Sequence, residues 1–297
     1  MGASLDAVVL AIGGVDPSGG AGVYADLDAV RDHRLAGAAA VAALTAQSSH
    51  EFLDFKAVAP ALLARQLEAV AGDVRIAALK IGMLGSAANV RVVEEFCAAR
   101  ARVPVVLDPV LMSTSGGALA RDETTRALAE RLVPRAALVT PNVAEAMALT
   151  GVSAFGREGV AAAAAAIVER LGAAAVVVTG GDAADADAAA PARGRGRGRA
   201  VGGAPRAEVA DCFLERDGRA LWLRAPRVAP AGHARTMRGT GCRFATAVAC
   251  GLASGEPLLV AVRAAKRYVA RLIATRSARL GKGAAQAVPP SRRADPD

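Results

Sequence analysis

Short runs of apolar residues alternate along this chain with longer segments in which apolar residues recur every three or four positions. The short runs are typical of strands buried on both faces of a parallel sheet, and the longer segments of amphipathic helices. The predicted strands cover residues 7–12, 38–44, 76–81, 103–107, 137–140 and 174–179. The predicted helices cover 23–34, 60–71, 87–100, a segment ending near 132, 141–151, 159–171, the segment directly after 239–243, and 256–277. This alternation predicts a layered α/β fold.

Three other stretches break this alternation. Residues 208–215 and 219–223 flank Arg216-Asp217-Gly218, and an Asp-Gly turn of this kind predicts a β-hairpin. Residues 183–207 are rich in Arg, Gly and Ala without any apolar period, which predicts a disordered surface insert. We also expect the tail, 281–297, to be disordered, so that residues 1–280 form a single domain.

Composition supports one large domain. The 297 residues are 53% apolar but only 3% aromatic, which favours alanine-faced helices over an aromatic-centred core. The net charge is +8, and several of the arginines lie in 183–207, where no aromatic residue is interleaved to stack on bases. We therefore expect no nucleic-acid partner.

Other features exclude further classes of protein. The four cysteines form no CxxC pair and have no histidine at metal-ligand spacing, so neither a zinc site nor a disulfide framework is expected. The N-terminal residues lack a basic region followed by an apolar segment, and no later run is long enough to span a membrane. We expect a cytoplasmic protein without a membrane partner.

Glycine-rich loops follow the predicted strands. The first, 13–22, matches neither the GxGxxG dinucleotide spacing nor the GxxxxGK[ST] phosphate loop. It suits either phosphate binding or close approach of a substrate to the backbone. The sequence leaves both possibilities open.

A second glycine-containing turn, Gly239-Thr240-Gly241-Cys242, precedes an alanine-rich helix. The unpaired N–H groups and positive dipole end of a helix start attract anions, and they should favour a thiolate. Cys242 could therefore act as a base or nucleophile beside a bound phosphate. The alternative is a tight loop with a cysteine packed beneath it.

Polar residues at strand ends are further candidates. Asp108 follows the strand 103–107 and is either a ligand of metal or water, or a turn aspartate. Asn142 and Glu145 have the spacing of a helix capping box. The functional alternative for Glu145 is a carboxylate that holds metal-bound water near phosphates.

Six blocks in order, between about residue 7 and about residue 276, together resemble the hydroxymethylpyrimidine/phosphomethylpyrimidine kinases of thiamine biosynthesis, in the ribokinase-like superfamily. The blocks are residues 14–22 with 25–27, 44–47, 80–84, 106–110, 140–142 with 145, and 239–242. The resemblance implies a three-layer α/β/α sandwich with a mostly parallel central sheet. It also implies transfer of the γ-phosphoryl group of ATP to 4-amino-5-hydroxymethyl-2-methylpyrimidine, and then to its monophosphate, by a homodimer.

The resemblance also implies roles for individual residues. Cys242 would be the catalytic base, within the turn formed with Gly239, Thr240 and Gly241. Asp108 and Glu145 would organise Mg²⁺. The substrate would lie against Gln47, Gly14, Asp26, Met83 and Val110, and the nucleotide near Asn142 and Thr179.

Three departures from the family pattern leave alternatives open. Thr179 stands where a lysine is common, Thr236-Met237-Arg238 where Asn-Thr-His is usual, and Tyr24 where a glutamine is common. Arg238 or Arg243 could replace the missing lysine. The alternative functions are a pyridoxine or pyridoxal kinase and a non-catalytic pyrimidine-binding regulatory protein.

Overall fold

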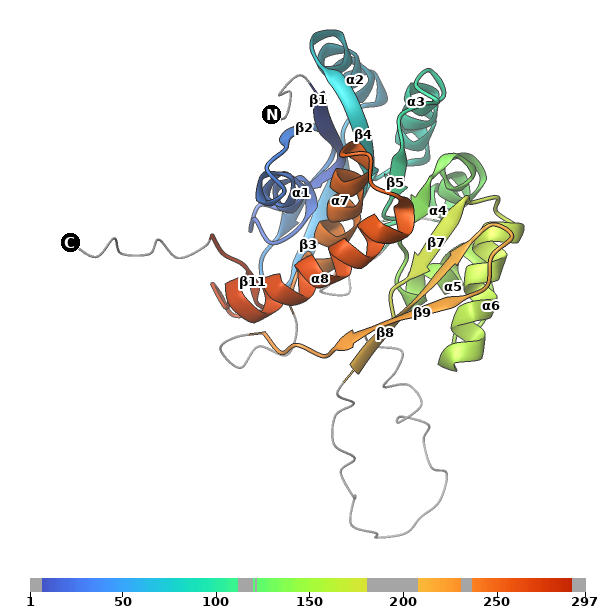
Figure 1. Ribbon diagram of the computed structural model, residues 1–297. Helices are drawn as coiled ribbons and strands as arrows, with labels where there is room; N and C mark the ends of the chain where they lie inside the picture. Colours follow the sequence, from blue (N-terminus) through green and yellow to red (C-terminus); the bar gives the residue numbers. More distant parts are fainter. Residues whose placement is uncertain (1–6, 112–119, 121, 181–207, 231–236, 290–297) are drawn as a thin grey trace, which may run out of the picture.

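The computed structural model describes residues 7–111, 120, 122–180, 208–230 and 237–289 (Figure 1). The predicted insert, 183–207, and the last part of the predicted tail, 290–297, lie outside the described residues.

Across the described residues, a central sheet has nine strands in the order β3-β2-β1-β4-β5-β6-β7-β8-β9. Pairing is parallel from β2 through β7, whereas β3 at one edge and the β8–β9 hairpin at the other pair antiparallel. The strands are β1 (Ala7–Val15), β2 (Ala36–Gln47), β3 (Phe52–Ala57), β4 (Arg75–Ile81), β5 (Val105–Leu107), β6 (Leu138–Val139), β7 (Ala175–Val178), β8 (Glu208–Glu215) and β9 (Leu221–Pro226).

Helices cover both faces of this sheet (Figure 1). They are α1 (Gly22–Asp32), α2 (Pro60–Asp73), α3 (Ala87–Ala98), α4 (Asp122–Ala127), α5 (Val143–Thr150), α6 (Gly156–Glu169), α7 (Thr240–Ala253) and α8 (Leu258–Arg276). A π-helical turn, Leu128–Leu132, and a 3₁₀ turn, Val133–Arg135, follow α4. One core cluster joins the sheet to α2–α6, and another joins it to α1, α7 and α8. The predicted mostly parallel three-layer α/β/α sandwich is therefore confirmed.

Strand β1 shows why the apolar runs form this core. Its Leu10 and Ile12 pack into the cluster with α2–α6, while Val9 packs into the cluster with α7 and α8. Because side chains alternate between the faces of a strand, only a continuous apolar run serves a sheet covered on both sides. The small residues of α7, such as Ala245 and Ala249, are fully buried and let that helix lie close over the sheet.

The structure adds one strand to the predicted elements and corrects one expectation. The added strand is β3, which pairs with the end of β2 and was not indicated by the sequence pattern. The tail prediction is wrong up to residue 289, since β10 (Ser277–Ala278) pairs with β11 (Gln286–Ala287), and Ala285 is buried. The tail is held by contacts with distant loops, including Arg238 N–H to the Ala285 carbonyl at 2.8 Å, which no local pattern reveals.

The predicted hairpin is confirmed, because β8 and β9 pair antiparallel. Asp217 adopts a φ of 63° in the β8–β9 turn, a left-handed conformation that aspartate tolerates. No helix in the described ranges is long and apolar enough to cross a membrane.

Candidate active site

The start of α7 meets the glycine-rich loop that follows β1. Gly239, at the helix N-cap, has a φ of 70°, and a Cβ atom there would lie 2.1 Å from the Gly20 carbonyl oxygen. The same carbonyl accepts a hydrogen bond from Arg243 Nη1 at 3.1 Å. Among the described residues no side chain caps the helix. A helix start of this kind favours an anion near its first N–H groups.

A buried charge cluster lies beside this helix start. Lys80 of β4 is 1% exposed, and its Nζ lies 3.0 Å from Asp26 Oδ1 of α1 and 3.4 Å from Asp108 Oδ2 after β5. Thr246 Oγ1 of α7 donates to Asp26 Oδ1 at 2.8 Å. Buried charges persist only when they are paired, so these four elements are tied together at the carboxyl edge of the sheet.

Lys80 is a candidate site residue to which the sequence pattern assigned no role. Burial by itself disfavours its ammonium form, but the charge of Asp26, followed by those of Cys242 and Asp108, raises the pKa of Lys80 above its usual value. Lys80 is therefore a fixed positive charge. A lysine inside the otherwise apolar run 76–81 was the signal that could have identified it, because buried lysines concentrate at functional sites.

Cys242 lies beside this cluster, but the surrounding residues do not activate its thiol. Burial, together with the charges of Asp108 and Asp26, raises the pKa of its thiol to about 12, although Lys80 and a hydrogen bond from the Gly22 backbone act in the opposite direction. The expected lowering of the thiol pKa is therefore wrong, because desolvation outweighs the helix start.

Asp108 also lies close to Glu145. The capping box is confirmed, since Asn142 N donates to Glu145 Oε2 and Glu145 N donates to Asn142 Oδ1, both at 2.9 Å. Burial and the charge of Asp108 nevertheless raise the pKa of Glu145 to about 8. Glu145 can cap the helix and still belong to the site, because its carboxyl group also experiences the charge of Asp108.

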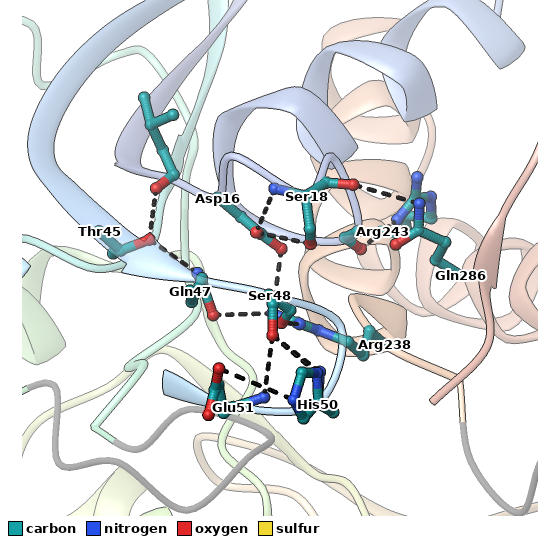
Figure 2. A network of polar contacts seen from close by, with 12 residues as sticks. Asp16, Ser18, Thr45, Gln47, Ser48, His50, Glu51, Arg238, Arg243 and Gln286 are labelled. Carbon is teal, nitrogen blue, oxygen red and sulfur yellow. Dashed lines mark hydrogen bonds and ion pairs between the residues drawn. The ribbon is translucent and has the colours of Figure 1, made fainter. Parts of the chain in front are cut away.

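The substrate side of the predicted site lies along β2. Arg238 is 2% exposed and reaches Asp16, Gln47 and Ser48 (Figure 2). Its Nη2 donates to Gln47 Oε1 at 2.7 Å and to Asp16 Oδ2 at 3.0 Å.

An apolar cluster lies along the same strand. Ala43 and Met83 are buried there, with Phe52, Phe55 and Val110 packed against them. Gly14 adjoins this cluster, since a Cβ on it would lie 3.1 Å from Met83 Sδ. The structure thus brings together Gly14, Met83 and Val110, as predicted, and places Gln47 farther along the strand that carries Ala43.

The predicted nucleotide residues Asn142 and Thr179 are also neighbours. They form a parallel bridge, and Thr179 Oγ1 donates to the Pro141 carbonyl at 3.3 Å. Arg238 and Arg243 direct their hydrogen bonds to the glycine-rich loop side, through Asp16 and the Gly20 carbonyl, rather than to Thr179. These contacts give no support to either arginine as a replacement for the missing lysine.

Comparisons with known proteins agree with this geometry. The family described as phosphomethylpyrimidine kinase matches residues 16–288. The hydroxymethylpyrimidine/phosphomethylpyrimidine kinase of Haemophilus influenzae is 35% identical over 89% of this chain and 90% of its own. The enzyme of the same name from Rhizobium meliloti is 34% identical over 94% and 95%.

Solved structures show the same fold. The pyridoxal kinase of Staphylococcus aureus in complex with ADP has a TM-score of 0.79 at 26% identity, covering 96% of this chain and 94% of that one. The phosphomethylpyrimidine kinase of Clostridium difficile has a TM-score of 0.68 at 25% identity, covering 89% and 98%. The match to the family over most of the sequence, together with this arrangement of site residues, establishes that the chain belongs to the phosphomethylpyrimidine kinase family.

Proposed function

We propose that this protein transfers the γ-phosphoryl group of ATP to the hydroxymethyl group of 4-amino-5-hydroxymethyl-2-methylpyrimidine, and then to the monophosphate so formed. The observation that carries the proposal is the cluster of Asp26, Lys80, Asp108 and Cys242 at the uncapped start of α7. Phosphoryl transfer depends mainly on positioning and on neutralising charge, which this cluster and the helix N–H groups supply.

In the proposed reaction the substrate hydroxyl oxygen forms a bond to the γ-phosphorus. The bond from that phosphorus to ADP breaks, and its electron pair leaves with ADP. Cys242 Sγ takes the hydroxyl proton. This role requires that substrate binding lower the thiol pKa from about 12, and Lys80 is the nearby charge that favours the thiolate.

Asp108 and Glu145 are the residues that would hold Mg²⁺. Asp108 Oδ2 is buried, and besides its ion pair with Lys80 at 3.4 Å it receives no hydrogen bond in the described part of the chain. The charge of Asp108 also raises the pKa of Glu145. A cation would give the Asp108 oxygen a further partner and would reduce the repulsion between Asp108 and Glu145. Within the described ranges no three His, Cys, Asp or Glu side chains gather to hold a metal, but Mg²⁺ commonly uses one or two carboxylates together with phosphate oxygens and water. When bound, the ion would neutralise charge on the phosphates.

Asn142 and Thr179 would lie near the nucleotide, at the carboxyl ends of neighbouring strands β6 and β7. The described residues, including the tail up to 289, would form one catalytic domain. A homodimer is supported by exposed apolar side chains on β2 and β3, at one edge of the sheet. Leu44 is 55% and Leu53 is 68% exposed there. Cys97, Cys212, Cys242 and Cys250 are free thiols, which suits the cytoplasm.

The direct test incubates purified protein with MgATP and either the aminopyrimidine or pyridoxal, following ADP and the phosphorylated products. We expect a higher kcat/KM with the aminopyrimidine, and formation of the diphosphate. An Asp108→Asn variant purified in parallel controls for contaminating kinases. Pyridoxal is the second candidate substrate because the pyridoxal kinase of Staphylococcus aureus shares this fold.

The results separate the three functions. A clear preference for pyridoxal would replace the proposal by the pyridoxal kinase alternative. Binding of the aminopyrimidine without turnover of either compound would indicate a regulatory binding protein.

A further inference from the structure

We propose that Arg238 is a positioning residue that fixes which way the side-chain amide of Gln47 faces, and that it thereby selects the substrate ring. The favoured ring carries an exocyclic amino group beside an unprotonated ring nitrogen. The disfavoured ring is the 4-oxo analogue, in which the donor and the acceptor exchange places. This inference rests on the proposed function.

Two independent contacts determine the orientation of the Gln47 amide (Figure 2). Thr45 Oγ1 donates its hydrogen to the Val15 carbonyl at 2.8 Å, so it can only accept from Gln47 Nε2, at 2.9 Å. On the other side, Arg238 Nη2 lies 2.7 Å from Gln47 Oε1, and a guanidinium group has no acceptor. A flipped amide would place a donor against Arg238 and an acceptor against a hydroxyl with no hydrogen left to give.

Arg238 is itself held rigidly. Asp16 Oδ2 accepts from its Nη2 at 3.0 Å, while Asp16 Oδ1 is held by the backbone and hydroxyl of Ser18 at 2.9 and 2.8 Å. The Ser48 carbonyl accepts from its Nη1. The backbone N–H of Arg238 donates to the Ala285 carbonyl at 2.8 Å. Because the guanidinium is buried and bound from several sides, it keeps Gln47 in one orientation.

The oriented amide lies on the same strand as the apolar cluster beside which we place the substrate ring. Thr45 and Gln47 bond to each other, and they share a face of β2 with Ala43, which packs in the apolar cluster with Met83 and Phe55. Gln47 keeps one N–H and one oxygen lone pair free of these contacts. In the amino compound, the ring nitrogen would accept from this N–H and the amino group would donate to this oxygen. In the 4-oxo analogue, a ring N–H would face the Gln47 N–H, and the ring carbonyl oxygen would face the Gln47 oxygen.

The test measures kcat and KM for the aminopyrimidine and for its 4-oxo analogue in wild-type protein, Arg238→Met and Arg238→Lys. We expect wild type to prefer the amino compound in kcat/KM by roughly tenfold or more, because a mismatch leaves buried polar groups unpaired. Arg238→Met should lower this preference through KM, with kcat less affected, because only the Thr45 contact then holds the amide. Arg238→Lys should retain more of it, since an ammonium group also only donates. Arg267→Met, at an exposed position on α8, is the matched control.

An active, folded Arg238→Met protein with the wild-type ratio would overturn the inference while leaving the proposed function intact. Should that variant fail to fold, calorimetric binding of both compounds to wild-type protein decides the matter. Equal affinities would mean that the amide is free to flip, whereas a tenfold preference for the amino compound would support the inference. Failure of the proposed function would show itself differently, as absence of aminopyrimidine turnover in wild type.

Discussion

Lys80 Nζ lies 3.0 Å from Asp26 Oδ1, with both side chains 1% exposed. The pair joins the fourth strand of the sequence to the first helix, and Asp108 approaches the same ammonium at 3.4 Å. Lys80 is thus the counter-charge that allows two carboxylates to be buried next to Cys242.

Replacing Lys80 should therefore damage both stability and turnover. Lys80→Met leaves Asp26 and Asp108 buried without their cation, which should cost about 3–5 kcal/mol in the free energy of unfolding. Urea denaturation measures this loss, and Lys56→Met, at an exposed position, should change stability by less than about 0.5 kcal/mol. Adding Asp26→Asn to Lys80→Met should recover part of the stability but not the turnover. Equal stability of Lys80→Met and wild type would contradict the burial of a charged pair.

Cys242→Ala should separate binding from chemistry. If the thiol accepts the proton in the reaction, turnover should fall roughly 10²- to 10⁴-fold, while the affinity for the aminopyrimidine stays nearly unchanged. ADP release and calorimetry measure the two quantities. Cys97→Ala, at the far end of α3, controls for the loss of any thiol. A kcat within twofold of wild type would remove Cys242 from the catalytic role.

Glu145 should make stability depend on pH. Its folded-state pKa of about 8 lies above the ordinary value of 4.5, so the folded protein binds more protons than the unfolded chain between these two values. The stability contributed by the protonated group is therefore present at low pH and lost as the pH rises toward 8. Glu145→Gln keeps a capping side chain and should gain stability relative to wild type on going from about pH 5 to about pH 8.

Denaturation midpoints of the wild-type and Glu145→Gln proteins across this range give the measurement, with the exposed Glu68→Gln as control. A stability difference that does not vary with pH would mean that Glu145 is ionised in the folded protein throughout.

Gly239→Ala should disrupt the turn at the start of α7. The φ of 70° disfavours any Cβ, and this one would lie 2.1 Å from the Gly20 carbonyl. We expect a loss of about 1–3 kcal/mol in unfolding free energy, together with a large drop in turnover. A Cβ at Gly241 meets no atom within 4 Å, so Gly241→Ala should be much the more stable of the two variants. Similar melting temperatures for both variants would refute the close approach of the two loops.

Removing the tail should weaken the substrate site. A chain ending at Leu280 loses the Ala285 contact to Arg238 and the bond from Gln286 Nε2 to the Ser18 carbonyl at 3.2 Å. We expect a lower melting temperature and a raised KM for the aminopyrimidine. A chain ending at Pro289 keeps these contacts and should behave as the full chain does. If both truncations behave alike, the segment 281–289 has no part in the site.

The sequence by itself determined the layers of the fold and most of the candidate residues, because these follow from local signals. Apolar runs specify buried strands, and glycines and polar residues at their ends specify loops, so Gly239, Asp108 and Glu145 were identified in advance. Tertiary structure alone decided the partners of Lys80, the protonation of Cys242, the orientation of Gln47 and the packing of the tail.

The physical reason is distance along the chain. Arg238 meets Gln47 across 191 positions, and Thr246 meets Asp26 across 220. The pKa of Cys242 likewise depends on burial and on charges brought together from β4, β5 and α1. A local pattern shows which residues are suited to such contacts, but only the folded chain shows which contacts form.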